Sequence, residues 1–221
     1  MTLYEKNKKI LSKNYSYNEN MEHDACGVGM IATTNGKKSR KIVDYGIEAL
    51  KAIWHRGAVD ADGKSGDGAG IQIEIAPEFF KDKITSTGQT LDEKKRICVG
   101  MVFLPRTNYT DQEKCREIIE SVLIEENYHI YGWRQVPVNS NVLGSTAERS
   151  RPEIAQVMFK KNEILKTNDL ERDLFETRKK IEKLARENQL KNFYICSFSS
   201  RSIVYKGMFL AEMLAEFYPD L

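Results

Sequence analysis

A cysteine near the start of the sequence could act as a nucleophile. Cys26 follows the polar pair His23-Asp24 and opens an apolar run in which Gly27 and Gly29 leave its sulfur uncrowded. A thiolate in such a position can attack a carbonyl carbon and form a covalent intermediate. A cysteine in an apolar run of an intracellular protein is, however, usually a small core residue. Residues 25–32 taken alone therefore favour the structural role.

A segment rich in glycine and aspartate is the second place where chemistry could occur. Residues 56–70 hold five glycines and three aspartates. Glycine supplies backbone conformations that other residues adopt at a cost, so this composition predicts a loop with unusual dihedral angles.

Three ligand-binding motifs are partly matched around these glycines, and each fails on its context. Residues 58–65 fit a relaxed phosphate-binding loop, but such a loop follows a strand and opens a helix, and nearby aspartates would repel a triphosphate. Residues 27–32 imitate a dinucleotide fingerprint, yet they lie inside an expected strand rather than after it. The spacing of the aspartates also suggests the start of a calcium loop, but Lys64 and Ile71 stand at two positions where such a loop needs an oxygen ligand. A nucleotide-binding domain therefore stays as the weakest alternative, and no metal site is predicted.

The elements that must position these residues follow from hydrophobic periodicity. The strands are predicted at residues 26–33, 71–75, 97–104, 128–136, 154–159, 193–198 and 202–205. Helices are predicted at residues 39–55, 110–123, 169–188 and 210–217. The second of them opens with a capping box of Thr110 and Glu113 and continues through Leu123. A turn at Ser199-Ser200 predicts a hairpin of the last two strands. Residues 1–22 are polar and predict a loosely held leader.

Composition excludes several classes of function. The 34 basic and 32 acidic residues are interspersed, so no nucleic-acid or anionic-membrane partner is expected. Four cysteines without a C-x-x-C pair and three histidines predict neither a zinc site nor a disulfide framework. The sequence has no secretory signal and no apolar run of about 18 residues, which is the length that predicts a membrane span. These features indicate a cytoplasmic protein.

Several longer words of the sequence resemble one known family. They are Asp24-Ala-Cys-Gly-Val-Gly, Gly46-Ile-Glu-Ala-Leu-Lys-Ala, Trp54-His-Arg-Gly-Ala-Val-Asp-Ala-Asp-Gly-Lys, Gly66-Asp-Gly-Ala-Gly, Tyr131-Gly-Trp-Arg, Arg151-Pro-Glu-Ile, Phe193-Tyr-Ile-Cys-Ser, Tyr205-Lys-Gly-Met and Phe217-Tyr-Pro-Asp. Together they resemble the amino-terminal domain of the glutamate synthase large subunit, a class II glutamine amidotransferase of the N-terminal-nucleophile hydrolase superfamily. The likeness runs from about residue 22 to the last residue.

The resemblance implies a fold, a nucleophile and a processing step. The fold is α+β, a four-layer αββα sandwich. Cys26 is the expected catalytic nucleophile, and its free α-amine, with a pKa of roughly 7.7 to 8.0, would handle the proton. Because an amide-bonded cysteine has no such amine, residues 1–25 are expected to be a propeptide and 26–221 the amidotransferase domain. Glutamine would yield glutamate and ammonia through a thioester.

The resemblance also implies which residues surround the substrate glutamine. Arg56, Gly57, Asp67 and Gly68 are expected to bind substrate or form the site loop, with Cys26 at the lip of a cleft that residues 56–70 line. A guanidinium can hold a carboxylate with a planar fork of donors, although Arg56 could equally pair with a neighbouring aspartate. Asp67 is expected to shape the loop. His55 is expected to be structural, beside Trp54.

The sequence departs from the family downstream of these motifs. The family's carboxylate-clamping arginine and its Asn-Gly oxyanion pair are not found, and Asn35-Gly36 is expected to be a hairpin turn instead. We therefore expect a truncated domain, incomplete at its C-terminus and of low activity alone. FMN, an iron–sulfur cluster, the remaining domains and a small electron-donating subunit are expected only with the full-length enzyme. An inert folding or interaction module is the alternative.

Overall fold

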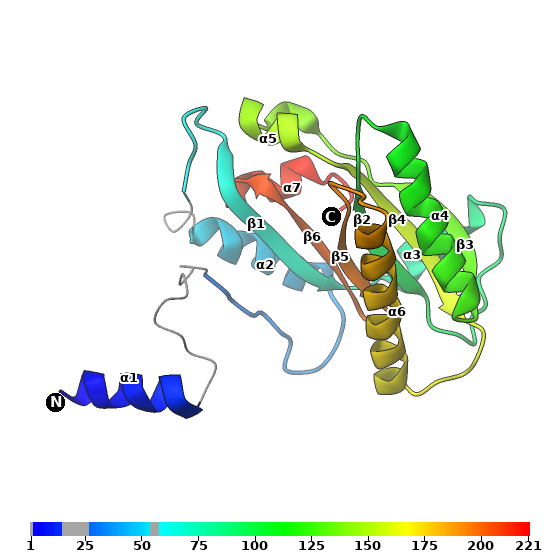
Figure 1. Ribbon diagram of the computed structural model, residues 1–221, viewed down its shortest axis with the longest axis horizontal. Helices are drawn as coiled ribbons and strands as arrows, with labels where there is room; N and C mark the ends of the chain where they lie inside the picture. The colour runs from blue at the N-terminus through cyan, green and yellow to red at the C-terminus, as the bar shows by residue number, and fades with distance from the viewer. Residues whose placement is uncertain (1, 15–26, 54–57) are drawn as a thin grey trace.

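The computed structural model describes residues 2–14, 27–53 and 58–221 and shows a mixed α/β protein (Figure 1). Its helices are α1 (Leu3–Asn14), α2 (Arg40–Ala52), α3 (Pro77–Thr85), α4 (Tyr109–Glu125), α5 (Ser145–Ser150), α6 (Thr167–Glu187) and α7 (Leu214–Phe217), with the short 3-10 helices η2 (Ser140–Val142) and η3 (Ala211–Met213). Its strands are β1 (Ser65–Glu74), β2 (Cys98–Leu104), β3 (Tyr128–Gln135), β4 (Glu153–Lys161), β5 (Tyr194–Ser199) and β6 (Ser202–Phe209).

These strands form two antiparallel sheets. The larger has the order β3-β4-β2-β5, and the smaller consists of β1 and β6. Strand β2 lies inside the larger sheet, and its side chains alternate between two cores because successive residues of a strand point to opposite faces. Cys98 and Val102 belong to one core, whereas Val99 and Met101 belong to the other. The near-continuous apolar run of β2 is thus explained by burial on both faces.

Each core joins the larger sheet to a different layer. Helices α4 and α6 cover one face, and α6 contributes the buried stripe of Leu170, Leu174 and Ile181. The other face shares its core with β6 and with helices α2, α3 and α7, through Ile203, Ile47 and other residues (Figure 1). Helices on both sides of two packed antiparallel sheets confirm the predicted α+β sandwich.

Strand β1 begins earlier than the sequence predicts. The predicted strand covers residues 71–75 and the predicted loop covers 56–70, but residues 65–70 already belong to β1. The pairing of β1 with β6 shifts register between Ser65 and Ala69, so the glycines form an irregular strand rather than an open loop. The prediction was wrong because this pairing joins residues far apart in sequence, and local composition carries no sign of it.

The prediction of a strand at residues 26–33 is also wrong for residues 27–33, the part of it that the structure describes. Residues 27–33 have no strand structure, and no strand of the described chain pairs with them. Val28 and Met30 are 94% and 90% exposed. An apolar run forms a strand only when a neighbour accepts and donates its backbone hydrogen bonds. The turn at Thr34 and Asn35 is present, but it does not join two strands.

Two further local predictions need correction. Helix α4 is capped by Asn108, whose side chain accepts from Asp111 N at 3.1 Å, so the capping box of Thr110 and Glu113 is wrong by two positions. Strands β5 and β6 follow each other closely, but they do not form a hairpin ladder because β5 pairs with β2 and β6 pairs with β1. The carboxylate of Glu171 in α6 accepts a hydrogen bond from Ser200 N at 2.8 Å and so holds the turn that connects β5 to β6.

Helix α1 lies within the predicted leader. None of its residues is buried, and Figure 1 shows it apart from the two sheets. The sequence did not predict this helix, and the role of residues 1–25 as a leader stays a prediction. None of the helices in the described ranges combines the length and the apolar composition of a membrane span.

Candidate functional site

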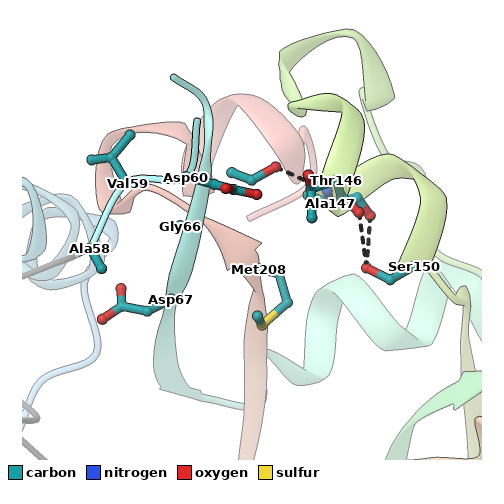
Figure 2. Close-up of a pocket in the computed structure, with 10 residues that line it drawn as sticks. Ala58, Val59, Asp60, Gly66, Asp67, Thr146, Ala147, Ser150 and Met208 are labelled. Carbon is teal, nitrogen blue, oxygen red and sulfur yellow. Dashed lines mark hydrogen bonds between the residues drawn. The ribbon is translucent and has the colours of Figure 1, made fainter. Parts of the chain in front are cut away.

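A cavity of about 270 Å³ lies where the glycine-rich segment passes beside α5 and β6 (Figure 2). It is lined by Ala58, Val59, Asp60, Ser65, Gly66, Asp67, Thr146, Ala147, Ser150 and Met208. Most of these residues come from the segment that the sequence predicts to form the wall of a cleft. Met208 of β6 lies between β1 and α5 in the close-up.

The glycine-rich segment is folded back on itself at this cavity. Val59 and Gly66 form an antiparallel bridge. Asp60 N donates to Ser65 O at 2.9 Å, and Asp67 N donates to Ala58 O at 3.3 Å. These backbone bonds give residues 58–67 a defined shape, so the residues that face the cavity have fixed neighbours.

The carboxylate of Asp62 ties this segment to the first turn of α5. It accepts from Ser65 Oγ at 2.6 Å, from Ser65 N at 2.7 Å and from Thr146 N at 3.1 Å. These bonds, that of the Ser65 hydroxyl foremost, hold the pKa of Asp62 well below its usual value because they favour the charged carboxylate. Ser65 Oγ in turn accepts from Ala147 N at 2.9 Å. Two residues of the segment thus satisfy two backbone donors of a short helix.

The predicted site residues Asp67 and Gly68 lie in β1 beside the register shift. Both are exposed, and Asp67 lines the cavity next to Ala58 (Figure 2). Gly68 has a φ of +117°, a value that residues with a side chain rarely adopt. Gly68 therefore allows the irregular backbone that carries Asp67 to the cavity.

Three of the predicted site residues, Cys26, Arg56 and Gly57, lie outside the described residues, as do Trp54 and His55. The described chain resumes at Ala58, which lines the cavity directly after Arg56-Gly57 in sequence. Cys26 at the lip of this cavity stays a prediction.

The three described cysteines are unsuited to nucleophilic chemistry. Cys98, Cys115 and Cys196 are buried and free. Burial raises the pKa of Cys115 and of Cys196 to about 11 and raises that of Cys98 as well. A thiol with such a pKa is almost entirely protonated near neutral pH, and the thiolate is the reactive form.

Sequence reasoning missed the contribution of α5 and β6 to the cavity. Thr146 and Ala147 belong to no motif, Met208 only ends the word Tyr205-Lys-Gly-Met, and the place of all three beside the cavity follows only from the tertiary fold. For Asp62 a local sign existed, since an aspartate followed by Gly-Lys-Ser is typical of a side chain that caps its own turn. In the described ranges, no group of three or more His, Cys, Asp or Glu side chains could hold a metal ion.

Comparison with known proteins assigns the chain to a class. The family model of class-II glutamine amidotransferases matches residues 26–221, and the chain belongs to this family. The matched region contains both sheets, the cavity and all five predicted site residues, and it begins at Cys26.

The individual relatives are glutamate synthases. The chain is 51% identical over 215 residues to the glutamate synthase (NADPH) large chain of Azospirillum brasilense, covering 97% of this chain and 14% of that protein. It is 43% identical over 203 residues to the ferredoxin-dependent glutamate synthase of Pyropia yezoensis, with 90% and 13% covered. It is 37% identical over 206 residues to the glutamate synthase (NADPH) large chain of Bacillus subtilis (strain 168), with 93% and 13% covered. The chain thus spans a small part of the length of these relatives.

Proposed function

We propose that this chain is the glutamine-hydrolysing part of a glutamate synthase and that Cys26 is its nucleophile. The observation that carries the proposal is the family match, which begins at Cys26 and continues through the glycine-rich segment. The buried state of the other three cysteines supports the choice of thiol.

The proposed reaction needs a free amino group on Cys26. After removal of residues 1–25, the α-amine would take the thiol proton while the sulfur attacks the side-chain amide carbon of glutamine. The carbon–nitrogen bond of the amide breaks, the nitrogen leaves as ammonia with the transferred proton, and a thioester remains. Water then attacks the thioester, which releases glutamate and restores the thiol.

The cavity beside residues 58–67 is the proposed place of the substrate. Ala58 and Asp67 line this cavity, and Arg56 and Gly57 come directly before Ala58 in the sequence. In the proposal, the Arg56 guanidinium holds the α-carboxylate of glutamine, because its planar fork of donors matches a carboxylate. Gly57 and Gly68 allow the backbone to approach the substrate closely, and Asp67 shapes the wall.

The wider reaction is proposed from the relatives. In a glutamate synthase the released ammonia would pass to 2-oxoglutarate, in other domains that use FMN, an iron–sulfur cluster and a small electron-donating subunit. None of these groups is assigned to the described residues. The proposal places the chain in the cytoplasm, where reducing conditions keep its thiols free.

Labelling with an electrophilic glutamine analogue tests the proposal. Diazo-oxo-norleucine should modify the purified protein once, at Cys26, and excess glutamine should protect that residue. The variant Cys26→Ser should take up no label. Absence of glutamine-protected labelling in the unmodified sequence would favour the alternative, an inert folding or interaction module.

A further inference from the structure

We propose that Asp62 and Ser65 are positioning residues that hold the two walls of the glutamine cavity in place; the inference rests on the function proposed above. One wall is the glycine-rich segment, with Asp60, Gly66 and Asp67, and the other is the first turn of α5, with Thr146 and Ala147. Nothing in the local sequence connects these walls, which lie about eighty residues apart along the chain.

The contact between the walls consists of side chains that bind backbone donors. Thr146 N donates to Asp62 at 3.1 Å, and Ala147 N donates to the Ser65 hydroxyl at 2.9 Å. Ser65 Oγ also donates to Asp62 at 2.6 Å, so the two side chains act together. Ser65 is 3% exposed, and a buried hydroxyl with its donor and acceptor capacity in use is held in one orientation.

The chain leaves room for this contact at Gly144. A methyl group at that position would lie 2.3 Å from Asp62 Oδ2 and 2.6 Å from Asp62 Cγ, which is closer than atoms can approach. The φ of Gly144 is −75°, a value that alanine adopts without strain. The glycine is therefore explained by the carboxylate beside it rather than by its own backbone.

The geometry allows the contact to be broken from either side. Asp62→Asn removes the charge and one acceptor oxygen, whereas Gly144→Ala leaves both side chains intact and displaces the carboxylate by its added methyl group. Asp111→Asn is the matched control, because Asp111 also lies at the start of a helix, α4, and does not line the cavity.

Two measurements on the purified protein test the proposal. The first is hydrogen exchange at the amides of Thr146 and Ala147, with those of β2 as the internal standard. The second is the rate at which Cys26 reacts with diazo-oxo-norleucine, compared with its rate toward iodoacetamide, which needs no substrate site. Both contact-breaking variants should increase exchange about fivefold or more at the two amides. They should also lower the rate at which Cys26 reacts with diazo-oxo-norleucine about tenfold, because the glutamine analogue is then misplaced relative to the thiol. The rate at which Cys26 reacts with iodoacetamide should not change.

Each result decides a separate question. Unchanged exchange in both variants would overturn the contact itself. Faster exchange with an unchanged ratio of the two labelling rates would overturn the positioning role and leave only a structural one. If the unmodified sequence takes up no glutamine analogue, the proposed function fails, and the exchange measurement still decides whether Asp62 and Ser65 hold the two walls together. Asp111→Asn should change neither measurement.

Discussion

Arg134 of β3 and Asp220, in the segment after α7, form an ion pair that is almost removed from solvent. Each side chain is 11% exposed. Arg134 also donates to Gln156 Oε1 at 2.7 Å and lies 5.0 Å from the ring centre of Phe79. Asp220 Oδ1 is buried and has no hydrogen-bond partner within the described chain. The pair therefore fixes the segment after α7 against the larger sheet.

We expect Asp220→Asn to lower the free energy of unfolding by about 3 kcal/mol. Removing one partner of a buried pair leaves the other charge buried without compensation, which typically costs about 3 to 5 kcal/mol. The remaining bond from Arg134 to Gln156 places this variant at the low end of that range. Urea unfolding followed by circular dichroism measures the change.

The exposed pair of Lys38 and Glu74 serves as the control. Both side chains are 60% exposed, so Lys38→Ala should change the free energy of unfolding by less than about 1 kcal/mol. Equal losses from Asp220→Asn and Lys38→Ala would contradict the distinction between the two pairs.

The cysteines should differ sharply in reactivity. At neutral pH, iodoacetamide should label Cys26 in the folded protein at least about tenfold faster than Cys98, Cys115 or Cys196, because burial raises the pKa of the last three and hides them. Peptide mass spectrometry after timed labelling reads all four rates. Similar rates at Cys26 and any buried cysteine would count against Cys26 as the reactive thiol, and labelling in denaturant provides the reference.

Buried tyrosines should make the fold sensitive to alkali. Burial raises the pKa of Tyr205 to about 12, and it also raises the pKa of Tyr128 and of Tyr218. An unfolded tyrosine has a pKa of about 10. Because the folded values are higher, this contribution to stability is fully present below about pH 10 and is lost as the pH rises toward the folded pKa.

The free energy of unfolding should therefore fall steeply above about pH 10, by up to about 1.4 kcal/mol per pH unit for each such tyrosine. Tyr205→Phe should make the fall less steep, since it removes one titrating hydroxyl whose bond to Gln156 Nε2 is long at 3.5 Å. Urea unfolding between about pH 9 and 11 measures both slopes. Identical slopes for the variant and the unmodified sequence would refute this origin of the alkaline loss.

Elements with strong periodicity could be predicted from the sequence. The spacing of Leu170, Leu174 and Ile181 indicates one face of a helix, and these residues are the buried stripe of α6. The bounds predicted for β2 differ from the observed ones by one residue, because its apolar run is too short for a typical buried helix. Helix α3 was missed although Pro77 at its first position is typical of a helix start.

Features that depend on distant partners could not be predicted in this way. Residues 65–70 form a strand because β6 pairs with them, and residues 27–33 do not because no described strand does. The same limit applies to the cavity. The sequence indicates that residues 58–67 form part of a site, but the contact from Asp62 to Thr146 depends on how α5 packs.

Ammonia release from glutamine, measured together with the intact mass, shows whether Cys26 must be the first residue of the protein and its nucleophile. We expect activity, low for these residues alone, only from protein that begins at Cys26, with ammonia and glutamate released in equal amounts. Cys26→Ser should lower the rate by more than about three orders of magnitude, because no other group can form the thioester. Ammonia release at a comparable rate by Cys26→Ser, or by protein that still carries residues 1–25, would contradict the account.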